Sequence, residues 1–139
     1  MRVHVCRHAE AAPGDPDELR ELTEPGLAQA RALARQLDGS PARPTLVLTS
    51  PLLRARQTAA VIGEELGVPV LVDSRLAPGA TAATLRAAIV GLEGPVATVG
   101  HQPDCSEIAV SLTGRDPGFS VGTAVELEVE LDPGAGTQA

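Results

Sequence analysis

Four cationic or titratable side chains stand at, or shortly after, the ends of apolar stretches that resemble strands. These stretches are residues 2–6, 45–50 and 95–100. Open α/β sheets bind their ligands at the carboxyl edge of the strands, so side chains that follow three such strands meet there. We therefore expect one cluster at that edge, formed by Arg7, His8, Arg54 and His101.

His8 is the candidate nucleophile of this cluster. The sequence has no GxSxG motif for a serine nucleophile, and neither cysteine has a paired base beside it. A histidine nucleophile needs a neutral imidazole, with one nitrogen facing the electrophile and the other held by a hydrogen bond. Because guanidinium groups match phosphate oxygens, Arg7, Arg54 and a protonated His101 would surround a phosphoryl group and neutralise its charge. This chemistry predicts phosphoryl transfer without a metal ion.

The elements that must position the cluster alternate along the chain. Apolar runs at 45–49, 68–72 and 96–99 predict strands, and apolar residues alternate with glutamates at 125–131. This order is typical of an α/β fold with a mostly parallel sheet and helices on both faces. Capping residues and helical periodicity place the helices from Thr23 to Gly39, from Ser50 to Leu66, from Thr81 or Thr84 onward, and from Asp104 to Leu112.

The helix that carries Arg54 is expected to begin at Ser50 and Pro51. A serine hydroxyl caps helices, and proline suits the first helical position because its missing N–H is not needed there. Arg54 then lies in the first turn, where free N–H groups already favour anions. In the last strand, we expect Glu126, Glu128 and Glu130 to protect a sheet edge rather than to bind a metal.

Composition limits the classes of partner. The 139 residues are 43% hydrophobic, which suits one domain at 1–132, followed by a disordered tail at 133–139. A net charge of −7 and the lack of Trp and Tyr argue against nucleic acid, which needs basic surfaces and stacking side chains. An anionic ligand must therefore be held by a local cluster of cations. The acidic, aromatic-poor surface favours a monomer.

The cysteines and the amino terminus indicate a reduced, cytoplasmic protein. Cys6 and Cys105 are too few for a disulfide framework and lack metal-ligand spacing, so we interpret both as small buried residues. The start MRVHVC lacks the apolar core of a signal peptide, and no apolar run reaches membrane-spanning length. Neither GxxxxGK[ST] nor GxGxxG occurs, so no nucleotide cofactor is expected.

The motifs together resemble the histidine phosphatase superfamily, which has a phosphoglycerate mutase-like fold. The resemblance implies a three-layer α/β/α sandwich, a transiently phosphorylated His8, and a phosphate pocket completed by Arg7, Arg54 and His101. Ala9 stands where the superfamily usually has glycine. The matching segments are Arg7-His8-Ala9, LTEPGLAQA (22–30), SPLLRARQTA (50–59) and VGHQPDCSEIAVSLTG (99–114). Within the third segment, the motif matches Arg54 rather than Arg56.

One departure from the superfamily pattern bears on the substrate. Mutases and many phosphomonoesterases of the superfamily carry a glutamate as general acid after the third strand, whereas no carboxylate occurs here between Asp73 and Glu93. An alkoxide leaving group needs a proton, but a phosphoramidate can already carry one on nitrogen. The absent acid therefore favours phosphohistidine on a protein, as in the short SixA-type branch.

Several alternatives stay open from the sequence. The protein is alternatively a small-molecule phosphomonoesterase of the same superfamily, or a catalytically silent module that binds phosphorylated proteins. Glu10 would supply a proton if its side chain turned inward, whereas a brace for Arg7 or exposure to solvent is the favoured interpretation. His4 lies out of register with the cluster and is expected to be a hydrogen-bonded structural residue.

Overall fold

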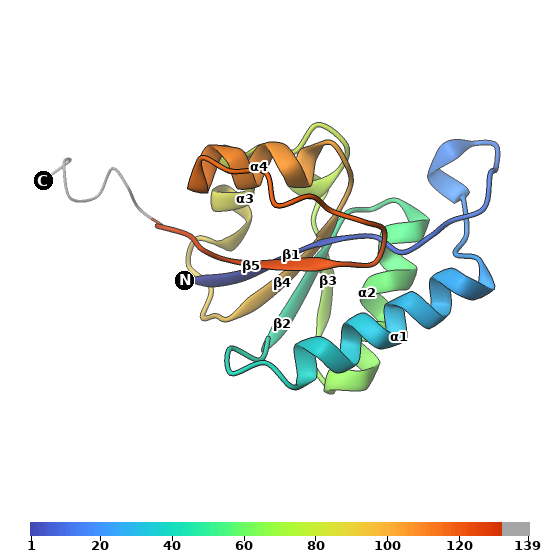
Figure 1. The fold of residues 1–139 in the computed structure, drawn as a ribbon, viewed down its shortest axis with the longest axis horizontal. Coiled ribbons are helices and arrows are strands. Elements are labelled where there is room, and N and C mark those ends of the chain that lie inside the picture. The colour runs from blue at the N-terminus through green and yellow to red at the C-terminus, as the bar shows by residue number, and fades with distance from the viewer. Residues whose placement is uncertain (132–139) are drawn as a thin grey trace, which may run out of the picture.

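The computed structural model of the protein describes residues 1–131, and the tail expected at 133–139 lies outside these residues. Strands and helices alternate as predicted (Figure 1). Two 3-10 turns, η1 (Asp17–Leu19) and η2 (Ser74–Leu76), lie in the connections. The described elements are β1 (Arg2–Arg7), α1 (Glu24–Asp38), β2 (Leu46–Thr49), α2 (Leu53–Leu66), β3 (Val70–Val72), α3 (Ala82–Ile89), β4 (Val96–Gly100), α4 (Asp104–Thr113) and β5 (Ala124–Glu128).

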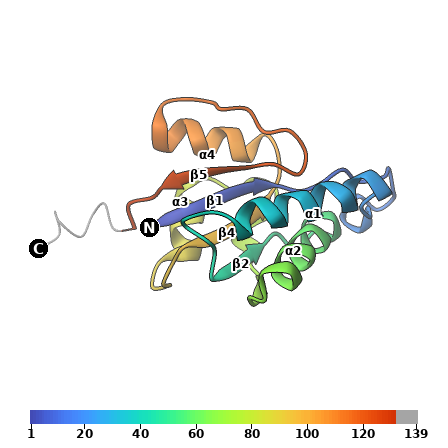
Figure 2. The ribbon, with the colours of Figure 1, turned by 60° about the horizontal axis from the view of Figure 1, so that its bottom comes forward.

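The strands form one sheet in the order β3-β2-β4-β1-β5. The pairs β3–β2, β2–β4 and β4–β1 are parallel, and β5 runs antiparallel to β1 at the edge. Helices α1 and α2 cover one face, and α3 and α4 cover the other (Figures 1 and 2). The expected three-layer α/β/α architecture is therefore confirmed.

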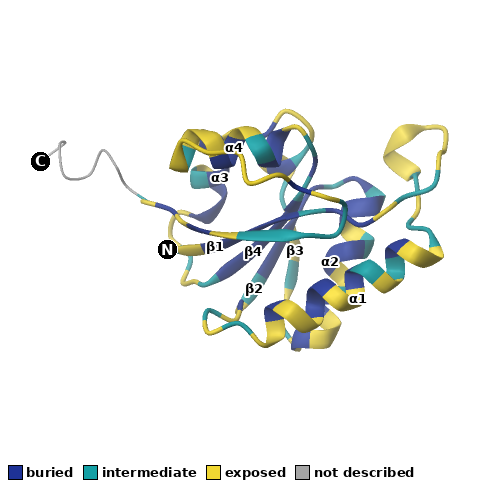
Figure 3. Ribbon diagram, in the orientation of Figure 1, coloured by how far each residue is buried: buried dark blue, intermediate teal, exposed yellow. Residues whose placement is uncertain are grey.

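Two apolar layers hold the helices on the sheet. Leu33, Leu37 and Ile62 are buried between α1, α2 and one face, while Leu85 and Ile89 pack against the other. Buried residues line the central strands and the inner faces of the helices (Figure 3). Each such side chain contributes about 1.5–3 kcal/mol when fully buried, so branched aliphatic residues build this core almost without aromatics.

The register of the sheet brings the ends of three neighbouring strands to one level. Arg7 of β1 pairs with Gly100 of β4, and Thr49 of β2 pairs with Val99 of β4. One residue further, the His8 N–H donates to the Gly100 carbonyl at 3.0 Å. The segments that follow β1, β2 and β4 therefore leave the sheet side by side.

Residues at the helix ends follow the predictions except at α2. Thr23 caps α1 by accepting from the Gly26 N–H at 3.0 Å, and Gly67 ends α2 in the left-handed conformation. The expected start of α2 at Ser50 is wrong, because the helix begins at Leu53 and its N-cap residue makes no side-chain hydrogen bond. The Ser50 N–H instead donates to the Val99 carbonyl at 3.0 Å, which keeps Ser50 in line with β2.

The edge strand β5 carries Glu126 and Glu128 outward, as expected, but it ends at Glu128, so the exposed Glu130 lies beyond it. Glu126 and Glu128 are exposed, and Arg2 lies 3.5 Å and 3.2 Å from their carboxylates. The amino group of Met1 binds Glu128 at 2.7 Å. None of the described helices combines the length and apolarity that crossing a membrane requires.

Gly26 lets helix α1 approach the segment after His8, and its replacement tests this contact. A Cβ atom at position 26 would collide with the Glu10 carbonyl oxygen, whereas one at Gly39 would meet its nearest neighbour at 3.6 Å. We expect Gly26→Ala to lower the free energy of unfolding by about 1–3 kcal/mol. Gly39→Ala should leave it unchanged or raise it slightly. Chemical denaturation measures both, and equal effects would contradict the prediction.

Candidate active site

His8 stands just beyond β1 with one ring nitrogen already occupied. Its Nδ1 lies 2.7 Å from the Ala9 carbonyl oxygen. A carbonyl only accepts hydrogen bonds, so Nδ1 carries the proton and Nε2 keeps its lone pair. Burial lowers the pKa of His8, and the charges of Arg54 and Arg7 lower it further, against the opposing effect of the Ala9 hydrogen bond. The imidazole is therefore neutral at pH 7, as a nucleophile must be.

His101 lies beside His8, with their ring centroids 5.3 Å apart. Its Nε2 is 2.7 Å from the Ser50 hydroxyl, while its Nδ1 is buried without a hydrogen-bond partner. Burial lowers the pKa of His101 to about 4, with smaller contributions from the charges of His8 and Arg54. The His101 ring is therefore neutral in the anion-free protein at neutral pH, and its expected protonated form beside a bound phosphoryl group stays a prediction.

Arg7 and Arg54 are each anchored at the end of the guanidinium group. Arg7 Nη1 donates to the Phe119 carbonyl at 2.9 Å, and Arg54 Nη1 donates to the Asp17 carbonyl at 2.9 Å. The Nε atoms of both arginines are buried and unpaired. Each guanidinium is thus fixed in place, and its buried Nε–H has no partner.

Thr58 ties the helix that carries Arg54 to the residue after His8. Its hydroxyl donates to the Arg54 carbonyl at 2.8 Å and accepts from the Ala9 N–H at 3.0 Å. Thr58 is fully buried, so water does not compete for these bonds. The spacing between His8 and Arg54 is therefore set by the fold.

Three buried side-chain nitrogens within residues 1–131 lack a hydrogen-bond partner. They are Arg7 Nε, Arg54 Nε and His101 Nδ1, one from each predicted neighbour of His8. Leaving a buried donor unpaired costs roughly 1–3 kcal/mol, so a fold retains such donors for a reason. Each of these nitrogens is free to form a hydrogen bond with a ligand such as a tetrahedral oxyanion. This set of donors next to a neutral histidine can bind and transfer a phosphoryl group.

Sequence reasoning missed Asp17 and Arg20, which lie in the segment between β1 and α1. The carboxylate of Asp17 is 3.2 Å from both Arg54 Nη2 and Arg20 Nη1. The hydrogen bond from Arg20 lowers the pKa of Asp17, and Arg54 adds to this effect, so the carboxylate is ionised at neutral pH. Arg20 also lowers the pKa of His8 through its charge. No sequence motif includes these two residues. Their position in the loop after His8 was the one feature that could have indicated that they lie near the site.

The two residues considered next to the cluster point away from it. Glu10 is exposed and accepts from the Thr23 hydroxyl at 2.7 Å, so it neither turns inward nor braces Arg7. Arg56 is exposed and donates to the Pro51 carbonyl at 2.9 Å, as the choice of Arg54 over Arg56 requires.

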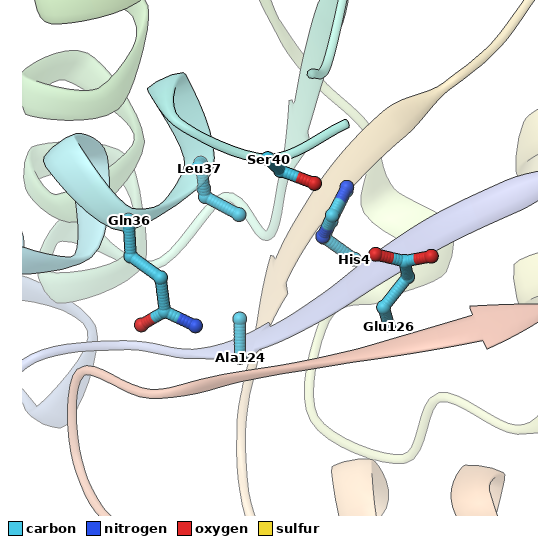
Figure 4. Close-up of a pocket in the computed structure, with 6 residues that line it drawn as sticks. All are labelled: His4, Gln36, Leu37, Ser40, Ala124 and Glu126. Carbon is cyan, nitrogen blue, oxygen red and sulfur yellow. The ribbon is translucent and has the colours of Figure 1, made fainter. Parts of the chain in front are cut away.

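His4 and the cysteines have structural roles, as expected. His4 is buried, and its Nε2 lies 2.7 Å from the Ala42 carbonyl oxygen. Cys6 and Cys105 are buried free thiols, and burial raises the pKa of Cys105 to about 12 and that of Cys6 further, which keeps both protonated. His4 borders a hollow of about 210 Å³ (Figure 4), lined by His4, Gln36, Leu37, Ser40, Ala124 and Glu126.

The sequence profile of the histidine phosphatase superfamily (branch 1) matches residues 3–78. The chain belongs to this superfamily. Among its relatives is the phosphohistidine phosphatase SixA of Escherichia coli, which is 39% identical over 70 residues, covering 50% of this chain and 44% of that protein. The family and its SixA relatives together identify the chain as a phosphatase.

Solved structures of the superfamily share the whole fold. The protein histidine phosphatase SixA complexed with tungstate superposes with a TM-score of 0.84 at 27% identity, over 95% of this chain and 90% of that one. A mycobacterial glucosyl-3-phosphoglycerate phosphatase superposes with a TM-score of 0.73 at 24% identity, over 94% and 92% of the two chains. The second likeness concerns the fold alone. Together they confirm the phosphoglycerate mutase-like architecture.

The contact between Asp17 and Arg54 predicts competition between this carboxylate and a bound anion. We expect Asp17→Asn to bind tungstate about two- to fivefold more tightly, because exposed ion pairs contribute up to about 1 kcal/mol. Asp15→Asn removes the same charge from an exposed residue without a recorded ion pair and should have a smaller effect. Isothermal titration calorimetry measures both affinities. Weaker binding by Asp17→Asn would mean that Asp17 orients Arg54 rather than competing for it.

Proposed function

We propose that the protein is a metal-independent phosphohistidine phosphatase in which His8 is transiently phosphorylated. The observation that carries the proposal is the set of unpaired buried donors of Arg7, Arg54 and His101 beside the free Nε2 of His8. Within the described residues, no group of three or more His, Cys, Asp and Glu side chains is arranged to hold a metal ion. The guanidinium groups would supply the positive charge that the reaction needs.

The reaction has two steps that share one set of residues. In the first, the Nε2 lone pair of His8 attacks phosphorus, the bond from phosphorus to the leaving atom breaks, and the leaving group keeps the bonding pair and its proton. In the second, water attacks the phosphorus of phosphorylated His8, the bond from phosphorus to Nε2 breaks, and Nε2 takes back the bonding pair. The protons of water leave on inorganic phosphate, and the imidazole is again neutral with its proton on Nδ1. Arg7, Arg54 and His101 would hold the phosphoryl oxygens in both steps. The negative charge of the transition state is spread over these oxygens.

The carboxylates around the site favour a nitrogen leaving group. Asp17 contacts Arg54 but is ionised at neutral pH, so it has no proton to donate. Asp104 is buried and accepts from the Gly79 N–H at 2.8 Å. Glu10 is turned toward Thr23. With these carboxylates engaged, a leaving group that brings its own proton suits the site better than an alkoxide.

Relatives support a phosphorylated protein as the substrate. The E. coli relative is a phosphohistidine phosphatase by name, and the tungstate complex is of a protein histidine phosphatase. We propose the same class of substrate for this chain. That residues 1–132 form one domain and that the protein acts as a cytoplasmic monomer stay predictions from the sequence.

A comparison of leaving groups tests the substrate class. Phosphoramidate and p-nitrophenyl phosphate do not need a general acid. Glycerol phosphate does, because its leaving group is an alkoxide. We expect kcat/KM for glycerol phosphate to be about 10²- to 10⁴-fold lower than kcat/KM for phosphoramidate. This factor is the usual contribution of a general acid. Measurements of phosphate release between pH 6 and pH 8 give these values. Comparable rates on glycerol phosphate would favour a small-molecule phosphomonoesterase.

A trapping experiment tests the role of His8. After brief reaction with ³²P-labelled phosphoramidate and quenching, we expect acid-labile, base-stable label on the wild-type protein. His8→Ala should lose the label and about a thousandfold or more of the activity. The control His4→Gln changes a histidine outside the cluster, and it should keep both the label and the activity of the wild type. Turnover that survives in His8→Ala would contradict the proposal, and a wild type inactive on every phosphoramidate would favour a binding module.

A further inference from the structure

We infer that Ser50 is a positioning residue whose hydroxyl fixes His101 in the tautomer with its proton on Nδ1. Ser50 was expected to cap a helix, yet it makes no such cap. Its hydroxyl lies against a ring of the candidate site instead. The consequence of this tautomer for phosphoryl transfer rests on the proposed function, whereas the tautomer itself follows from the hydrogen bonds.

The Ser50 hydroxyl is enclosed between two protein groups. Its oxygen lies 2.7 Å from His101 Nε2 and accepts from the Leu52 N–H at 3.2 Å. Ser50 is 0% exposed and His101 is 4% exposed. Ser50 and His101 therefore form their hydrogen bonds with protein groups, without competition from bulk water.

Counting hydrogens decides between the two neutral tautomers. A hydroxyl has one hydrogen, and the Ser50 oxygen already accepts from Leu52. If this hydrogen is donated to His101 Nε2, the Ser50 hydroxyl is fully paired, and the ring proton sits on Nδ1, where it is available to a bound oxyanion. In the opposite tautomer, Nε2 donates to the same oxygen, and the buried hydroxyl hydrogen has no recorded acceptor. That arrangement is disfavoured because the hydroxyl hydrogen stays unpaired among protein groups even when an oxyanion is bound, whereas an oxyanion accepts the Nδ1–H of the first tautomer.

The position of this proton matters because His101 has only one ring proton at neutral pH. Its Nδ1 is one of the three unpaired nitrogens of the candidate site, together with Arg7 Nε and Arg54 Nε. With the proton on Nδ1, all three nitrogens are hydrogen-bond donors for an oxyanion. With the proton on Nε2, a lone pair would face the phosphoryl oxygens and repel them. Ser50 thus makes a neutral histidine serve as a donor.

Nuclear magnetic resonance tests the tautomer directly. Long-range ¹H–¹⁵N spectra distinguish Nδ1–H from Nε2–H, and the chain has three histidines to assign. We expect Nδ1–H for His101 in the anion-free wild type at pH 7, and a shift toward Nε2–H in Ser50→Ala. Thr98→Val removes another buried hydroxyl and should leave the tautomer unchanged. An Nε2–H signal in the wild type, or an unchanged tautomer in Ser50→Ala, would overturn the inference.

Anion binding gives a second readout that needs no turnover. We expect Ser50→Ala to bind tungstate about tenfold more weakly, the usual effect of losing one good donor to a charged group, while Thr98→Val stays close to the wild type. Unchanged affinity in a folded Ser50→Ala would overturn the role in binding. Failure to hydrolyse phosphohistidine would count against the proposed function alone, since neither measurement depends on it. If Ser50→Ala does not fold, the wild-type spectrum still decides.

Discussion

The parallel register of β1, β4 and β2 is the constraint on which the candidate site depends. Arg7 lies opposite Gly100, and Thr49 lies opposite Val99, so the three strands end together. A shift of one residue would turn a side chain to the other face of the sheet. The apolar layers on both faces forbid such a shift, because they specify which side chains point into which layer. The apolar core thereby sets the geometry of the polar site.

The electrostatics of the site differ from those of the chain as a whole. The protein carries a net charge of −7, yet the charges of Arg7 and Arg54 act on His8, and His101 lies beside it. Both histidines have lowered pKa values, since burial disfavours their charged forms and the arginines repel further positive charge. An incoming dianion would face permanent cations and neutral imidazoles, so binding does not wait for a histidine to gain a proton.

The sequence predicted the strand ends better than the contacts made by the loops. β-Branched runs and capping residues such as Thr23 act locally, so the layers and the placement of His8 could be predicted. Ser50 was misplaced because a serine before proline favours a cap, while its bond to His101 joins residues 51 positions apart. The bonds of Asp17 to Arg54 and of Glu10 to Thr23 are similarly long-range and leave no periodic pattern.

The Thr58 hydroxyl has a consequence for how substrates reach the protein. Because it joins the backbone of Ala9 to that of Arg54, the segment that carries His8 and the helix that carries Arg54 are held together before any ligand arrives. Enzymes that assemble their site by induced fit close loops or domains around the substrate before the reaction. A preassembled pair imposes no such closure. A substrate of any size would therefore meet His8 and Arg54 already in place.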